Sequence, residues 1–248
     1  MDVTEFIHLS KAPIAEALLD IKIRVKDTFD VSQLQTLHDS IKTEYPDKKT
    51  QHELQNKVEM KKGEAPISTS IDKITGYIFG SSDKKQIFQA KISGFTFNRL
   101  SPYETWESFR SEAFRLWQIY SKLLSPVITR VAVRYINKFS LPLPIRDFNE
   151  YLVAAPIVPE GLPQAVSSFL NRVVIPFPDI EASAIVTQVF EQLEDPSLLP
   201  LILDIDVSKM YSKGVSEEEA WQVLENFRDI KNKIFFGSVT PKAKELFL

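Results

Sequence analysis

The stretches SPYETW, residues Ser101–Trp106, and SEEEAW, residues Ser216–Trp221, follow one pattern. Each is a Ser-x-x-Glu sequence, in which the serine hydroxyl can accept a hydrogen bond from the third helical amide while the glutamate reaches back to the serine amide. Each also places a tryptophan at the same offset. The pattern predicts two helices with equivalent starts, one in each half of an internally duplicated chain.

Both predicted helices carry a broad apolar stripe. Over residues 102–124 and 217–235, large apolar side chains recur at spacings of three and four. A stripe of this kind is typical of a helix that packs on a sheet. In the second helix the acidic residues come early and the lysines come late, which suits the helix dipole.

Three segments alternate apolar and polar side chains as strands do, namely residues 15–26, 127–139 and 199–209. Such alternation is typical of an antiparallel sheet with one buried face and one solvated face. Between residues 86 and 99 the apolar parity switches near Gly94. This switch predicts one strand with a β-bulge, for which glycine is suited.

Together these elements predict an α+β fold in which residues 1–248 form a single unit with pseudo-repeat halves 1–125 and 126–248. Each half is expected to run strand, helical region, three strands, capped helix. The expected product is a long antiparallel sheet with the two long capped helices on one face. In outline this arrangement is saddle-like and resembles that of the TATA-binding protein, a likeness of fold that carries no function.

The composition excludes several classes of site. The chain has 248 residues, 44% of them hydrophobic, and a net charge of −3 from 30 basic and 33 acidic residues, which argues against general coating of nucleic acid. Because cysteine is absent, disulfides, thiolate metal sites and a cysteine nucleophile are excluded. The 7 glycines form no phosphate-binding loop, and no Gly-x-Ser-x-Gly motif is present. We therefore expect no cofactor.

The beginning of the sequence, Met1–Phe6, has neither a basic region nor an apolar region of the kind found in signal peptides. The apolar stretches are far shorter than the ~20 residues that a membrane-spanning helix needs. We therefore expect a cytoplasmic protein without a membrane partner. The histidines lie far apart in the sequence, and we expect no catalytic or metal-binding role for them: His8, His38 and His52.

Charged residues on the predicted strands leave two alternatives open. Asp204 and Asp206 share a strand face, and with Asp20 they form a candidate Mg²⁺ or Ca²⁺ site for a metal-dependent enzyme. A basic stripe along one strand fits single-stranded nucleic acid, and its members are Arg130, Arg134 and Lys138. We favour a third interpretation, in which these acids and bases neutralise one another across the strands.

Several blocks of sequence carry a wider resemblance. They are Ala12–Ala17 (APIAEA), Asp83-Lys84 with Gln89, Gly94–Trp106 (GFTFNRLSPYETW), Arg134–Asn137 (RYIN) and Asn226–Phe236 (NFRDIKNKIFF). Together they resemble an uncharacterised prokaryotic family described as sporadically distributed proteins. The resemblance implies a bacterial or archaeal cytoplasmic protein, and the uneven distribution of that family is similar to that of genes on mobile or defence-associated islands. It implies no catalytic residue.

Polar residues embedded in these blocks are the candidate binding residues: Arg99, Tyr103, Arg134, Asn137, Arg228, Lys231 and Asn232. Their positions, at strand ends and along the predicted helices, allow them to converge. One hypothesis is a binding surface for an anionic or protein partner. The other is a buried hydrogen-bond network that ties the two halves together.

The missing nucleophile, metal and nucleotide motifs favour a non-enzymatic binding or assembly module that acts through its sheet face. We expect its partner to be a protein or a second copy of the chain, in a defence or toxin–antitoxin setting. A metal-dependent enzyme and a nucleic-acid binder are the alternatives.

Overall fold

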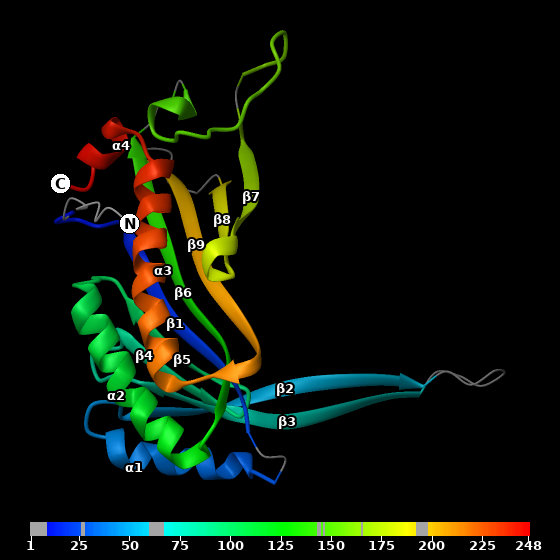
Figure 1. Cartoon of the computed structure of the whole chain (residues 1–248). Helices are drawn as coiled ribbons and strands as arrows, with labels where there is room; N and C mark the ends of the chain where they lie inside the picture. The colour runs from blue at the N-terminus through cyan, green and yellow to red at the C-terminus, as the bar shows by residue number, and fades with distance from the viewer. Residues whose placement is uncertain are drawn as a thin grey trace.

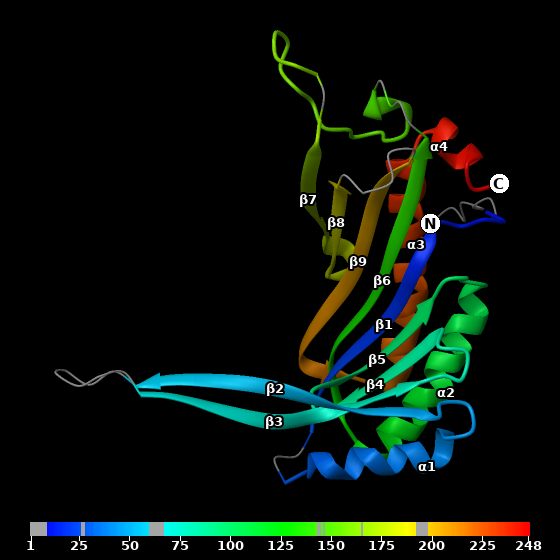
Figure 2. The same ribbon diagram turned by 180° about the vertical axis from the view of Figure 1, so that it is seen from behind.

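One large antiparallel sheet organises the chain. The computed structural model describes residues 9–25, 28–59, 67–142, 145, 147–164, 166–191 and 198–248. In these residues the sheet has nine strands, in the order β2-β3-β4-β5-β1-β6-β9-β8-β7 (Figures 1 and 2). The strands are β1 (Ile14–Arg24), β2 (Asp47–Glu59), β3 (Ile67–Gly80), β4 (Gln86–Lys91), β5 (Gly94–Leu100), β6 (Val127–Pro142), β7 (Ser168–Phe177), β8 (Ala182–Glu191) and β9 (Leu198–Val215). The helices are α1 (Leu37–Ile41), α2 (Trp106–Leu124), α3 (Glu217–Ser238) and α4 (Pro241–Glu245), with short 3₁₀ turns η1 (Val31–Thr36), η2 (Phe148–Glu150) and η3 (Pro178–Ile180).

The two alternating segments that begin the predicted halves, β1 and β6, lie side by side in the middle of the sheet. Leu19 of β1 faces Val133 of β6, and Asp20 faces Ala132, in antiparallel register. Because successive side chains point to opposite faces of a strand, Leu19 and Val133 are buried on one side while Asp20 lies on the other. The predicted α+β class and antiparallel sheet are confirmed.

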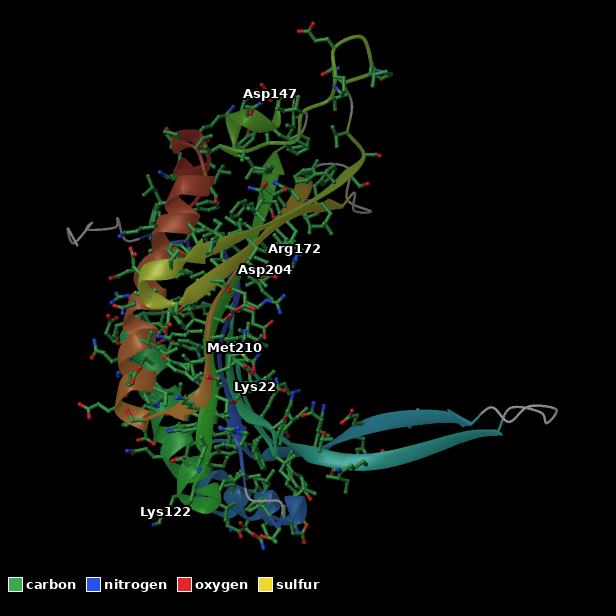
Figure 3. The ribbon with its side chains drawn as sticks, turned by 45° about the vertical axis from the view of Figure 1, so that its right-hand side comes forward. Lys22, Lys122, Asp147, Arg172, Asp204 and Met210 are labelled. Atoms are coloured by element: carbon green, nitrogen blue, oxygen red, sulfur yellow. The ribbon has the colours of Figure 1, made fainter. Side chains whose placement is uncertain are left out.

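The long helices cover one face of this sheet (Figure 3). Trp117 of α2 packs edge-on against Phe95 of β5 with ring centroids 5.6 Å apart, and Phe109 of α2 stacks on Phe97 of β5 at 5.4 Å. Helix α3 lies over β6 and β9. We call the opposite side, which carries Asp20, Arg134 and Asp204 among others, the helix-free face. No helix in the described part of the chain is long and apolar enough to cross a membrane.

Helices α2 and α3 also contact each other. The indole Nε1 of Trp106 donates to Glu225 of α3 at 2.8 Å, and that of Trp117 donates to Glu217 at 2.7 Å. The first residue of α2 therefore meets the third turn of α3, and a residue past the middle of α2 meets the first residue of α3, so the helices run antiparallel. These contacts join residues from the two predicted halves.

The start of α2 differs from the prediction. The helix begins at Trp106, and the hydroxyl of Thr105 accepts from the Ser108 amide at 3.1 Å as its N-cap. Ser101 lies outside the helix, since residues 101–105 are not helical. The predicted Ser101 capping box is wrong.

The start of α3 agrees with the prediction. The Ser216 hydroxyl accepts from the Glu219 amide at 3.2 Å. However, Trp221 lies one turn inside α3, whereas Trp106 is the first residue of α2. The two tryptophans therefore do not occupy equivalent helix positions, and that part of the prediction is wrong.

The predicted bulged strand over residues 86–99 is a hairpin. Strands β4 and β5 are joined by a turn at residues 92–93, and Phe88 pairs with Phe97 across them. Gly94 has a different reason to be glycine, because a Cβ there would lie 2.6 Å from the carbonyl oxygen of Ile21 on β1. The parity switch marks a change of strand, and the bulge prediction is wrong.

The strands of the two predicted halves lie on opposite sides of the centre of the sheet. Each leading strand, β1 or β6, is followed outward by the last strand of its own half, β5 or β9. The described residues of the first half contain four strands after the helical region, where the sequence predicted three. The additional strand arises because the segment predicted as one strand over residues 86–99 forms two, β4 and β5. The far part of the β2–β3 hairpin projects beyond the rest of the sheet (Figure 1).

Candidate functional site

Tyr135 is the centre of a cluster that several predicted residues form. Its hydroxyl lies 3.0 Å from that of Tyr103, and the Nζ of Lys231 lies 4.0 Å from its ring centroid. Arg228 precedes Lys231 by three residues on α3 and pairs with Glu107 at 3.2 Å. We call Tyr103, Tyr135, Arg228 and Lys231 the Tyr135 cluster.

Three separate segments bring this cluster together. Strand alternation on β6 directs Tyr135 to the buried, helix-covered side. Residues three apart on a helix share a side, so α3 presents Arg228 and Lys231 together. Tyr103 comes from the segment between β5 and α2, where its ring packs against Phe109 at 5.9 Å.

Burial and charge change the acid–base properties of the cluster. Burial, with a further contribution from the positive charge of Arg228, lowers the pKa of Lys231 to about 7. Burial raises the pKa of Tyr103 to about 12 and that of Tyr135 well above its ordinary value. Near pH 7, Lys231 therefore exchanges between its neutral and charged forms, while both tyrosines keep their protons.

The other predicted residues lie outside the cluster. Arg99 donates to Glu104 at 2.8 Å, and the buried amide of Asn137 donates to the carbonyl oxygen of Leu203 at 3.0 Å. Asn232 follows Lys231 on α3 and is partly buried. Arg134 lies on the helix-free face. The structure thus brings Tyr103, Arg228 and Lys231 together, gives Asn137 a buried hydrogen bond between β6 and β9 within the second predicted half, and places Arg134 apart from both.

The helix-free face carries a row of ion pairs. Arg134 donates to both carboxylate oxygens of Asp204, at 2.9 and 2.6 Å. Arg130 contacts Asp20 at 2.8 Å and Asp206 at 3.5 Å. Burial raises the pKa of Asp206 despite the nearby arginines. Each of the three aspartates of the alternative metal site therefore lies beside an arginine, and each arginine of the basic stripe lies beside an acid.

Within the described ranges, no group of three or more His, Asp or Glu side chains could hold a metal ion. His38 lies 3.0 Å from the carbonyl oxygen of Tyr45 and stacks on Phe79, and His52 lies 2.9 Å from Asp72. These are local structural contacts. The third histidine, His8, lies outside the described residues.

Replacing Asp20 by asparagine is expected to lower the free energy of unfolding by about 1–3 kcal/mol. Asp20 accepts from Arg130 and also from the Thr96 hydroxyl, each at 2.8 Å, so the amide would leave a partly buried guanidinium with a weaker partner. Urea denaturation measures the change. Asp204→Asn is the comparison, and it should cost less because Arg134 is more exposed than Arg130. Equal stability of Asp20→Asn and the unchanged protein would contradict the expectation.

The outermost strand, β7, exposes apolar side chains on both of its faces. Leu170 is 70% exposed, Val174 is 53% exposed and Val173 is 46% exposed. Leu170 and Val174 pair with Val189 and Ile185 of β8 on the helix-free face. The single charged residue of the strand is Arg172, which Figure 3 labels near the end of the sheet that also carries Asp204.

No motif in the sequence singles out the β7 edge or Tyr135. The apolar residues of the segment SFLNRVVIPF do not alternate cleanly, and a strand of that kind is typical of a buried position. A usable signal was the combination of a short apolar strand with Pro176, because proline is confined to edges within sheets. Tyr135 belongs to the RYIN block, but Tyr103 precedes it by 32 residues and Lys231 follows it by 96, so no local pattern joins them.

Comparison of the chain with protein-family models and with curated proteins finds no match.

Proposed function

We propose that this chain is a non-enzymatic binding and assembly module, and that the partner at its β7 edge is a second copy of the chain. The observation that carries the proposal is the difference between the two ends of the sheet. One end is a charged strand and the other is an exposed apolar strand.

The first support is the character of the edges. An outer strand leaves part of its backbone unpaired and can add a strand from another chain, and proteins commonly prevent this with charged residues. The described side chains of β2 follow that rule, with Lys48, Lys49 and Glu53 all exposed. In β7 three exposed residues are large and apolar, Leu170, Val173 and Val174, against one charged residue, Arg172, which favours addition of a strand there.

The second support is that β7 is complementary to itself. In an antiparallel pair centred on Val173, Val173 meets its own copy, and Arg172 lies opposite Val174 of the second copy. The two arginines therefore do not face each other directly, and the unpaired backbone edge of each β7 gains a partner. Two-fold pairing of one surface with itself is the commonest way in which soluble proteins form oligomers.

Val173→Lys is expected to weaken this dimer at least about tenfold, because it places two lysines opposite each other at the two-fold axis. Leu54→Lys is the matched control, since Leu54 is 65% exposed on the opposite edge strand and lies outside the proposed contact. Sedimentation velocity over a range of concentrations measures the association. Circular dichroism verifies that both variants are folded.

Two results would overturn the proposal. One is a chain that stays monomeric at all concentrations tested. The other is Val173→Lys and Leu54→Lys dimerising as strongly as the unchanged protein.

An internal duplication of the chain and a saddle-like outline are also part of the proposal. An internal duplication is supported by the strand order, in which β1 and β6 occupy corresponding central places. A saddle-like outline is supported by the curve of the helix-free face in Figure 3. Membership of the sporadically distributed family, a prokaryotic cytoplasmic location and a defence or toxin–antitoxin setting are proposed on the sequence blocks alone.

A further inference from the structure

Lys231 has an unusual environment for a lysine. Its side chain is partly buried on the inner side of α3, and among the described residues the group that it contacts is the ring of Tyr135. The charge that acts on it most strongly comes from Arg228 and has the same sign. Ammonium groups that are withdrawn from water are normally paired with an anion.

A carboxylate at the edge of the cluster pairs with Arg228. Glu107 contacts the Arg228 guanidinium at 3.2 Å, and its side chain is 69% exposed. An exposed ion pair of this kind offsets little of the positive charge of the Lys231 ammonium group. The cluster therefore contains two cationic groups and one peripheral acid, and Lys231 lacks an acidic partner among the described residues.

The remaining groups of the cluster are hydrogen-bond donors. Lys231 offers three N–H groups, and Arg228 offers five in a planar fork. In the contact between Tyr103 and Tyr135, one hydroxyl donates to the other, so one phenolic proton stays available. The Arg228 side chain is 37% exposed, which leaves the cluster open to solvent along α3.

We propose that the Tyr135 cluster binds a small oxyanion, a phosphate or a carboxylate, which pairs with Lys231 and Arg228 and accepts a hydrogen bond from a tyrosine hydroxyl. The ligand would supply the negative charge that the described residues do not place beside Lys231. This site lies on the helix-covered side of the sheet, away from the β7 edge, and it is independent of the proposed dimer.

Binding at this site is coupled to protonation. The groups that face Lys231 are Arg228 on its own helix, Tyr135 on β6 and, through Tyr135, Tyr103 before α2, with Glu107 of α2 beyond Arg228. Neither tyrosine ionises near neutral pH, so Lys231 is the group that titrates there. A bound anion favours its charged form, and the protein therefore takes up a proton when the anion binds above pH 7. Affinity falls as pH rises further.

The test is titration calorimetry with inorganic phosphate, and separately with acetate, at constant ionic strength and in two buffers of different ionisation heat. The unchanged protein is expected to bind at least one of the two anions with proton uptake. Lys231→Met should weaken that binding at least about tenfold, because a charge-assisted contact is lost. Lys231→Arg should retain binding and lose the proton uptake, since arginine does not titrate in this range.

Lys233→Met is the matched control, because Lys233 is exposed two residues further along α3. It should bind as the unchanged protein does. Tyr103→Phe removes one hydroxyl and should weaken binding without changing the proton uptake. Phosphate also stabilises proteins non-specifically, so the comparison between Lys231→Met and Lys233→Met decides the result. Equal binding by these two variants, or no binding of either anion by the unchanged protein, would overturn the proposal.

Discussion

Trp117→Ala is expected to lower the free energy of unfolding by about 3–5 kcal/mol, as measured by urea denaturation. The Trp117 side chain is 1% exposed and packs between the rings of Phe95 on the sheet and Tyr120 on its own helix. Its indole also donates to Glu217 at the start of α3. Truncation therefore leaves a cavity under α2 and removes a contact between the two long helices.

Two further variants separate these effects. Trp117→Phe keeps most of the buried ring and removes the hydrogen bond, and it should cost clearly less than Trp117→Ala. A double-mutant cycle with Glu217→Gln isolates the interaction between α2 and α3. Gln118→Ala, at the exposed neighbouring position, is the control and should change stability little. A cost below about 1 kcal/mol for Trp117→Ala would contradict this account of the helix layer.

Lys231→Met is expected to remove a pH dependence of stability. The pKa of Lys231 is about 7 in the folded chain and 10.5 for an ordinary lysine. Between these values the unfolded chain holds the proton and the folded chain does not. The free energy of unfolding therefore rises with pH over this range, by up to about 1.4 kcal/mol per pH unit from this one group.

Methionine has no proton to lose, so the contribution of residue 231 becomes constant. Lys231→Met should be more stable than the unchanged protein at pH 6, where the buried ammonium is most costly, and the difference should shrink as pH rises above 7. Urea denaturation from pH 6 to pH 10 in a buffer free of phosphate measures both quantities. Lys233→Met should follow the unchanged protein throughout. Parallel stability curves for Lys231→Met and Lys233→Met would show that Lys231 is not held in an unfavourable site.

The elements with strong periodicity could be predicted from the sequence. In β1 and β6, apolar and polar side chains alternate because one face of each strand is buried. On α3, apolar side chains recur at helical spacing. Both patterns can be read from neighbouring residues alone. The Ser101 capping box failed because a capping sequence is common, and here the chain takes Thr105 as the cap instead. The β4–β5 turn was missed because Gly94 was explained by local geometry, whereas its cause is the backbone of β1.

The candidate site could be predicted in part. Arg228 and Lys231 belong to one sequence block, and helical spacing is sufficient to place them on one side of the helix. The burial of Lys231 and its position over Tyr135 arise from packing between α3 and β6, which no local pattern specifies. The same limit applies to Arg134, because its separation from the cluster depends on which face of β6 the helices cover.

The two edge strands differ in composition, and this difference bears on how many copies of the chain can assemble. A chain with two apolar edges could add neighbours on both sides without limit, as fibrils do. In the proposed dimer, attachment at β7 would use the apolar edge of each copy, while the described part of the other edge strand, β2, exposes Lys48, Lys49 and Glu53, which disfavour strand addition. The composition of the two outermost strands thus favours a finite pair over a filament.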